Sequence, residues 1–167
     1  MNISRQIAGY LKSRELVLAS IETCSAGAIT AALADLPGGA AILDAGIVAH
    51  TPRALTGLPG ASVALQADEG VSESLARALA EALLDQRTGQ ATVTLASIGW
   101  FEAEEGSGSP IAHCFAWACR DRDGVCSASE TVLFTGRRVE VRRSIVRRAL
   151  LGLPRFVDSV FARERAE

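Results

Sequence analysis

Three residues that could act as nucleophiles follow one another in the chain: Thr23, Cys24 and Ser25. They come directly after the apolar run 16–21 and precede the two small residues 26–27. Small residues between a strand and a helix let a ligand approach the backbone. The first N–H groups of a helix lack internal partners and carry a partial positive charge. Such a helix start can bind a phosphate or stabilise the oxyanion of an acyl-transfer intermediate.

The same segment also has a structural interpretation. Thr23 or Ser25 would then accept hydrogen bonds from the helix as an N-cap, while Cys24 packs inward. In the functional interpretation Thr23 is the catalytic residue, and the cradle for a ligand or oxyanion is formed by Cys24, Ser25, Ala26 and Gly27. The junction by itself leaves both interpretations open.

Five segments match, in order, the motifs of a known family. Residues 21–27, Ile-Glu-Thr-Cys-Ser-Ala-Gly, are similar to a signature A-E-S-C-T-G-G. The other four segments are similar to D-x-P-G, G-G-V-V-T-Y-S, G-A-V-S-E and F-x-G-D-R, and they lie at 35–38, 45–51, 69–73 and 134–138. Over about residues 7–153 the chain therefore resembles a divergent member of the CinA C-terminal domain family, the nicotinamide-nucleotide amidases (PncC-type NMN deamidases).

The resemblance implies an activity and a set of roles. Members of this kind hydrolyse the carboxamide of nicotinamide mononucleotide (NMN) to nicotinate mononucleotide and ammonia. A serine of the first motif attacks, a lysine and a tyrosine from the second-strand region assist, and backbone N–H groups stabilise the oxyanion. The scheme fits the needs of amide hydrolysis. It implies a small-molecule ligand, no cofactor and a homo-oligomer.

The matched positions depart from this scheme where the chemistry lies. The serine position is Thr23, the tyrosine position is His50 and the lysine position is Leu55. The family's glycine-rich loop G-I-A-G-P-G-G-G is replaced by residues 97–104, in which bulky and acidic residues stand in place of glycines. Acidic side chains there would repel a phosphorylated ligand. Lys12, the only lysine, precedes the first expected strand. We therefore expect NMN amidase activity to be impaired or lost, with a binding or regulatory role remaining.

An active amidohydrolase is the alternative. Thr23 retains a hydroxyl, and His50 could act as its general base in place of the lysine. The substrate would be NMN or another amide. For another amide, the binding pocket of the enzyme would have to accommodate the side chains of Trp100 and Phe101.

The C-terminal part of the chain is rich in arginine. Residues 137–167 contain nine arginines and four acidic residues. At helical spacing Arg142 falls inside the apolar sector, where a guanidinium needs a carboxylate, backbone carbonyls or an anionic ligand. Glu22, which also needs a compensating charge, is a candidate partner. Arg142 could thus form a structural ion pair or contact the ligand, and the candidate ligand-binding residues are Glu22, Arg142 and Ser97. We expect His113, in the middle of an expected strand, to be structural.

Composition limits the class of protein. The chain has 167 residues, of which 49% are hydrophobic and 22% charged, as expected for one domain with a buried core. The net charge of -2 argues against binding nucleic acid through its phosphates. The four cysteines and two histidines lack metal-site spacing, so we expect no metal site and free thiols in the cytoplasm. We expect no signal peptide and no membrane association.

The elements that would position these residues alternate between helix and strand. We expect an opening helix over 3–13, a helix after the first motif that ends near Leu36, and a helix capped by Ser72. Arg137 would begin the last helix, with a break near Gly152 and Pro154. Expected strands are 16–21, 41–49, 92–98, 111–119 and 125–134. The sequence predicts an α/β fold: one domain, residues 1–167, with a mixed sheet between two helical layers and a helical extension over 154–167.

Overall fold

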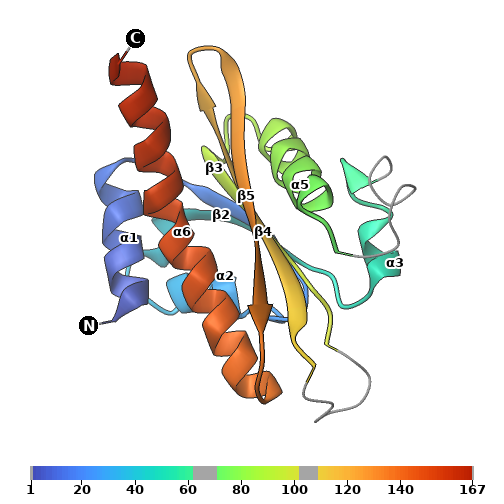
Figure 1. Ribbon diagram of the computed structural model, residues 1–167. Helices are drawn as coiled ribbons and strands as arrows, with labels where there is room; N and C mark the ends of the chain where they lie inside the picture. The colour runs from blue at the N-terminus through green and yellow to red at the C-terminus, as the bar shows by residue number, and fades with distance from the viewer. Residues whose placement is uncertain (1, 62–70, 102–108, 167) are drawn as a thin grey trace.

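The computed structural model describes residues 2–61, 71–101 and 109–166. Its centre is a five-stranded sheet in the order β2-β1-β3-β4-β5 (Figure 1). The strands β2, β1 and β3 are parallel, whereas β4 is antiparallel to β3 and β5 is antiparallel to β4. Their bounds are β1 Leu18–Glu22, β2 Leu43–Val48, β3 Val93–Ile98, β4 Ile111–Asp121 and β5 Gly124–Phe134.

Helices cover both faces of the sheet. The helices α1, α2 and α6 lie on one face, and α5, with α3 beside it, lies on the other (Figure 1). The bounds are α1 Ile3–Ser13, α2 Ala28–Ala34, α3 Pro52–Leu55, α5 Glu73–Gln86 and α6 Arg138–Ala166, and Gly39–Ala41 form a 3-10 turn. The predicted three-layer α/β fold with a mixed sheet is confirmed, and so is the opening helix.

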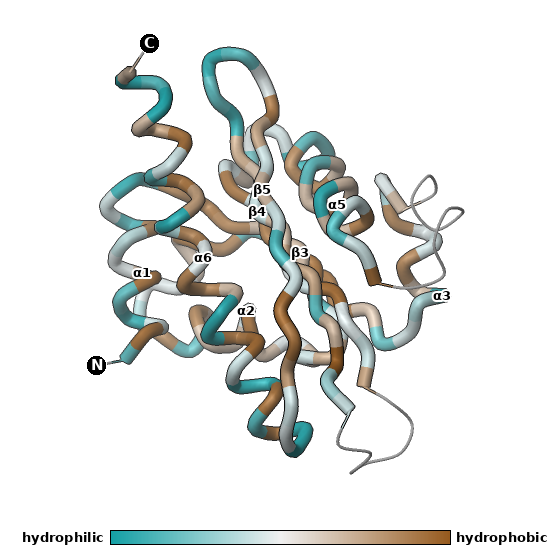
Figure 2. The backbone as a smooth tube through the Cα atoms, in the orientation of Figure 1, coloured by the Kyte–Doolittle hydropathy of each residue, from teal (hydrophilic) through white to brown (hydrophobic). Residues whose placement is uncertain are grey.

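Burial explains why the central strands form from apolar runs. Every residue of β1 and of β3 is buried, as expected for strands covered by helices on both faces. The side chains of one face pack into the core under α1, α2 and α6, and those of the other face pack under α5. Figure 2 shows hydrophobic residues along the strands and on the sides of the helices.

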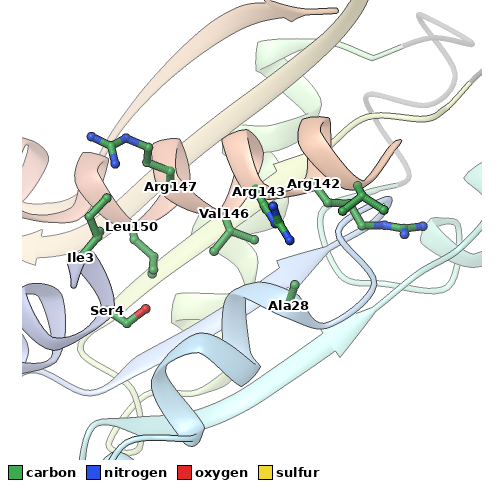
Figure 3. Close-up of a pocket in the computed structure, with 9 residues that line it drawn as sticks. Ile3, Ser4, Ala28, Arg142, Arg143, Val146, Arg147 and Leu150 are labelled. Atoms are coloured by element: carbon green, nitrogen blue, oxygen red, sulfur yellow. The ribbon is translucent and has the colours of Figure 1, made fainter. Parts of the chain in front are cut away.

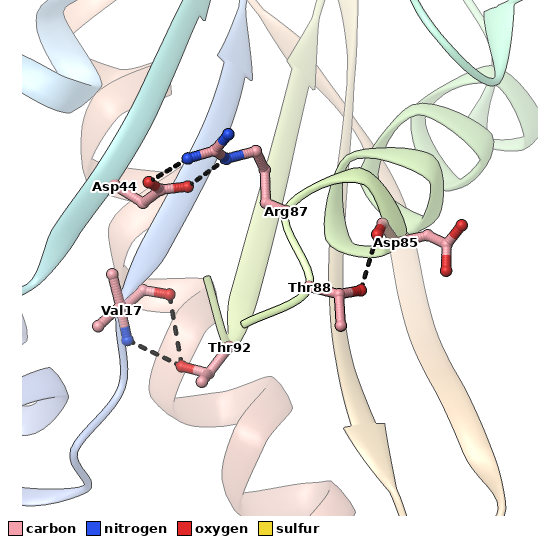
Figure 4. A network of polar contacts seen from close by, with 6 residues as sticks. All are labelled: Val17, Asp44, Asp85, Arg87, Thr88 and Thr92. Atoms are coloured by element: carbon pink, nitrogen blue, oxygen red, sulfur yellow. Dashed lines mark hydrogen bonds and ion pairs between the residues drawn. The ribbon is translucent and has the colours of Figure 1, made fainter. Parts of the chain in front are cut away.

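Polar contacts fix the ends of these elements (Figure 4). The guanidinium of Arg87, directly after α5, donates two hydrogen bonds of 2.7 Å to the carboxylate of Asp44 on β2. These hydrogen bonds lower the pKa of the Asp44 carboxyl. The N–H of Val17 donates to the hydroxyl of Thr92 at 2.8 Å and so joins the starts of β1 and β3. The parallel strands are thereby held in register where they begin.

The last helix corrects one prediction. We expected a break near Gly152 and Pro154, but α6 runs through both residues. Gly152 lies against the ring of Trp117 on β4, and a Cβ there would lie 2.0 Å from Cζ2 of that ring. The indole N–H of Trp117 donates to the carbonyl of Ala149 at 3.0 Å. The glycine is therefore required for close packing of helix on sheet, and tertiary contacts hold the helix through the proline.

Two sequence features lie outside the described residues: the acidic residues 102–105 and the first two residues of the match at 69–73. Among the helices that the structure describes, none is long and apolar enough to cross a membrane.

We expect Gly152→Ala to lower the free energy of unfolding by about 1–3 kcal/mol, because the added methyl group overpacks the contact with Trp117. Urea denaturation followed by circular dichroism measures the change. The matched control is Gly9→Ala on α1, where a Cβ meets nothing within 4 Å. That substitution should leave stability unchanged or raise it. Equal effects of the two substitutions would contradict the packing argument.

Candidate functional site at the end of strand β1

The carboxylate of Glu22, the last residue of β1, is fully buried at the N-terminus of α2. Its Oε1 accepts hydrogen bonds from the Ser25 hydroxyl at 2.7 Å and from the N–H groups of Gly27 and Ile29 at 2.9 and 3.2 Å. Its Oε2 accepts from the N–H and the hydroxyl of Thr30 at 3.2 and 3.3 Å. A buried carboxylate is costly unless it is hydrogen-bonded, and here the helix start supplies donors and a partial positive charge.

Of the four residues predicted to cradle an oxyanion, Ala26 and Gly27 have N–H groups that are hydrogen-bonded within this turn. The N–H of Ala26 donates to the carbonyl of Thr23 at 3.0 Å, and that of Ala28 donates to the carbonyl of Ser25 at 3.1 Å. The N–H of Gly27 donates to the buried carboxylate. Ala26 and Gly27 both have left-handed backbone angles, with φ of 58° and 93°. An oxyanion could use these donors only by displacing the hydrogen bonds already formed.

Thr23 lies where the carboxyl ends of β1 and β3 meet, the place where open α/β sheets bind ligands. Its hydroxyl donates to the carbonyl of Gly99 at 2.8 Å, with the carbonyl of Ser97 at 3.2 Å as a second acceptor. The same hydroxyl accepts from the N–H of Gly99 at 3.0 Å, and the side chain has no exposed area. Both roles of the hydroxyl are therefore engaged with the segment that follows β3.

The two other positions taken from the resemblance lie in different surroundings. His50 is exposed in a bend after β2, and in the described part of the chain no hydrogen bond joins its ring to Thr23. Leu55 ends α3 and is only 1% exposed, because it packs into the core under α5. A lysine at this position would have to bury its ammonium group, which is costly without a compensating partner.

Cys24, His113 and Ser97 form a buried polar chain that joins the β1 turn to β3 and β4. The hydroxyl of Ser97 lies 2.6 Å from Nε2 of His113, whose Nδ1 lies 3.8 Å from the sulfur of Cys24. Burial lowers the pKa of His113 to about 3 and raises the pKa of the Cys24 thiol to about 11. Both groups are therefore neutral near pH 7, and the thiol is not activated as a thiolate.

Arg142 reaches the same turn from α6. Its Nε donates to the carbonyl of Cys24 at 2.9 Å, and its guanidinium lies over the ring of Phe101, 5.4 Å from the centroid. Glu22, the partner suggested by the sequence, is instead compensated by the start of α2, and among the described residues no ion pair joins it to Arg142. The predicted ion pair between Glu22 and Arg142 is therefore wrong. Backbone groups compensate the charge of each side chain, and Arg142 also lies over an aromatic ring.

Sequence reasoning placed Cys24 and Ser97 at the site and treated His113 as structural, but it did not connect the three residues. The connection depends on the antiparallel register of β3 and β4, in which Ile98 pairs with Cys114. A further signal was Gly99, where a Cβ would lie 2.2 Å from Nδ1 of His113. Only the paired strands show that this glycine leaves room for the imidazole.

Comparison with known proteins identifies the family of this fold. A sequence model of the CinA C-terminal domain matches residues 1–157. The chain belongs to the CinA C-terminal domain family. The CinA-like protein of Syntrophus aciditrophicus is 31% identical over 153 residues, which are 90% of this chain and 36% of that protein. The CinA-like protein of Akkermansia muciniphila is 27% identical, over 91% of this chain and 36% of that protein. The chain thus spans little more than a third of these relatives.

Solved structures of the CinA superfamily have the same fold. The superfamily protein from Escherichia coli superposes with a TM-score of 0.79 at 25% identity, over 93% of this chain and 88% of that chain. The competence or damage-inducible protein from Enterobacter asburiae superposes with a TM-score of 0.76 at 26% identity, over 90% and 93% of the two chains. The resemblance inferred from the five motifs is therefore confirmed at the level of family and fold.

We expect Glu22→Gln to lower the free energy of unfolding by about 1–3 kcal/mol. The amide would keep one acceptor but would turn a donor toward the N–H groups or hydroxyls that now surround the carboxylate. Chemical denaturation measures the loss. Glu15→Gln, which neutralises an exposed carboxylate between α1 and β1, is the matched control and should change stability by less than about 0.5 kcal/mol. Similar losses in both variants would show that the buried hydrogen bonds are unimportant.

The lowered pKa of His113 predicts a pH dependence of stability. Between pH 6.5 and about 3 the unfolded state binds a proton that the folded state excludes. The free energy of unfolding therefore falls as the pH drops through this window, by at most about 1.4 kcal/mol per pH unit for this group. His113→Asn should reduce that slope in urea titrations from pH 7 to 4. His50→Asn removes the only other histidine and is the control. An unchanged slope in His113→Asn would refute this assignment.

Proposed function

We propose that this chain is a CinA-family domain that has lost NMN amidase chemistry at its first motif and acts as a ligand-binding module. The observation that carries the proposal is the Thr23 hydroxyl, which is fully buried and donates to and accepts from the backbone of Gly99. A nucleophile needs an accessible lone pair and space for the attacked carbon. Here the hydroxyl is enclosed, its proton is donated to a backbone carbonyl, and one of its two lone pairs accepts from the N–H of Gly99.

The surroundings of Thr23 support the same conclusion. The proposed base, His50, is exposed, whereas Thr23 is buried. The position matched to the family lysine is the core residue Leu55. The N–H groups of Ala26 and Gly27 are engaged within the turn. The Thr23 hydroxyl and two of the four predicted oxyanion donors are thus already hydrogen-bonded, and the proposed base is exposed whereas the nucleophile is buried. Hydrolysis with this set of residues would require the turn to rearrange.

An active amidohydrolase is the second candidate, and one observation favours it. A hydroxyl remains at the carboxyl end of β1, beside β3, in the motif that carries the nucleophile in the resembled amidases. For catalysis the Thr23 hydroxyl would have to leave Gly99 and meet a base such as His50.

Ammonia release from NMN by the purified chain tests the proposal. We expect none above the level measured with Thr23→Val, which removes the hydroxyl and keeps the shape of the side chain. We also expect Thr23→Val to lower the free energy of unfolding by about 1–3 kcal/mol, because Gly99 loses both hydrogen bonds. Thr23→Ser retains the hydroxyl and should retain most of the stability.

Turnover by the unaltered chain that disappears in a folded Thr23→Val variant would overturn the proposal in favour of the amidohydrolase. Loss of that turnover in His50→Ala as well would then assign the base, since His50 is exposed and its removal leaves the core unaltered.

A further inference from the structure

A groove between α1, α2 and α6 lies on the helical face that carries Arg142. It has a volume of about 390 Å³, which suits a small molecule. Its apolar walls are the side chains of Ile3, Ala28, Val146 and Leu150 (Figure 3). Val139 extends the apolar surface at one end and is 56% exposed. The groove therefore offers apolar contact area that the described residues leave uncovered.

Three arginines of α6, Arg142, Arg143 and Arg147, also line the groove, and no acidic residue is among its lining residues in the described part of the chain (Figure 3). Arg142 is bound to the β1 turn through its Nε. Arg143 and Arg147 are exposed, and neither has an ion-pair or hydrogen-bond partner among the residues that the structure describes. By contrast, Arg148, on another side of α6, forms an ion pair with Glu130.

Arg143 and Arg147 are four residues apart on one helix, so their side chains start from neighbouring positions on its surface. Their guanidinium groups point apart (Figure 3), and both side chains are exposed, so binding one anion requires them to turn toward each other. Two guanidinium groups at this spacing can bind one carboxylate or phosphate through charge-assisted hydrogen bonds. The apolar walls formed by Val146 and Leu150 lie along the same groove. An occupant that satisfies both features has an apolar body and a single anionic group.

We propose that this groove binds a small amphipathic anion, with its apolar body against Val146 and Leu150 and its carboxylate or phosphate held by Arg143 and Arg147. The inference names the ligand class for the proposed binding role and rests on it. It places the ligand along α6, whereas the first motif lies in the turn after β1.

A second copy of the chain is a poorer occupant. In a two-fold contact the same surface meets itself, so the groove arginines of one copy would face those of the other. Like charges brought together without a carboxylate between them oppose association. Charge complementarity therefore favours an anion over self-association through this groove.

Isothermal titration calorimetry tests the proposal with four probes. Decanoate and decyl phosphate carry the expected apolar body and anionic group. The probe with the lower Kd shows whether the groove prefers a carboxylate or a phosphate. Decyltrimethylammonium has the same apolar body with the opposite charge, and adenosine monophosphate is an anion with a polar body. We expect one or both decyl anions to bind with a stoichiometry of one, and the other two probes to bind at least about tenfold more weakly.

Variants assign the binding to the groove. Arg143→Gln combined with Arg147→Gln should raise the Kd of the decyl anion by about tenfold or more. Val146→Asp, which places a carboxylate in the apolar wall, should do the same. Arg155→Gln changes the net charge by one unit, as Val146→Asp does, but on exposed α6 surface outside this groove, and it should leave the Kd within about twofold. Circular dichroism and melting temperature confirm that each variant is folded.

Three outcomes would overturn the inference: no binding of either decyl anion, equal weakening by Arg155→Gln, or tighter binding of adenosine monophosphate. Concentration-dependent dimerisation that Val146→Asp abolishes would assign the groove to a second copy instead. Ammonia release is measured separately. Turnover of NMN with intact decyl anion binding would therefore reject the loss of amidase chemistry alone, whereas absent binding without turnover would reject the groove ligand alone.

Discussion

The buried carboxylate of Glu22 is the constraint on which the rest of the β1 turn depends. A charge with no access to water must be compensated within a few ångströms, and here the compensation comes from three N–H groups and two hydroxyls of the following turn and helix. These hydrogen bonds fix where α2 begins and which way the chain turns after β1. In the same turn the carbonyl of Cys24 accepts a hydrogen bond from Arg142, and the hydroxyl of Thr23 donates one to Gly99.

This arrangement gives one segment two possible uses that compete for the same atoms. The N–H groups of Ala26 and Gly27 and the hydroxyl of Ser25 could stabilise an oxyanion, but each has only a limited capacity for hydrogen bonds. In this chain they are hydrogen-bonded within the turn and to Glu22. The buried side chains of Cys24 and His113 are likewise unsuited to catalysis. Burial keeps both groups neutral, whereas acid–base or thiolate chemistry would require their charged states.

The helical face of α6 behaves differently from the turn. Around the turn, the charged groups of Glu22 and Arg142 are matched to donors, acceptors or an aromatic ring. Along the groove, Arg143 and Arg147 lack such partners among the described residues and lie beside uncovered apolar side chains. Buried polar groups in folded proteins are nearly always hydrogen-bonded within the protein. Charged and apolar surface groups without such contacts are therefore the better candidates for binding a ligand, and this is why we place the proposed ligand on α6.

The sequence by itself determined the layers, the family and the motif that forms the β1 turn. Apolar runs identify strands covered on both faces, and helical spacing and caps such as Ser72 identify the helices, because these signals are local. The break expected at Gly152 was wrong because the role of this glycine depends on Trp117, 35 residues away in the chain. The partners of Thr23, Arg142 and His113 were likewise decided only by the tertiary structure. Strand register and helix packing bring together atoms that are distant in the sequence, and local residue patterns carry no information about those distances.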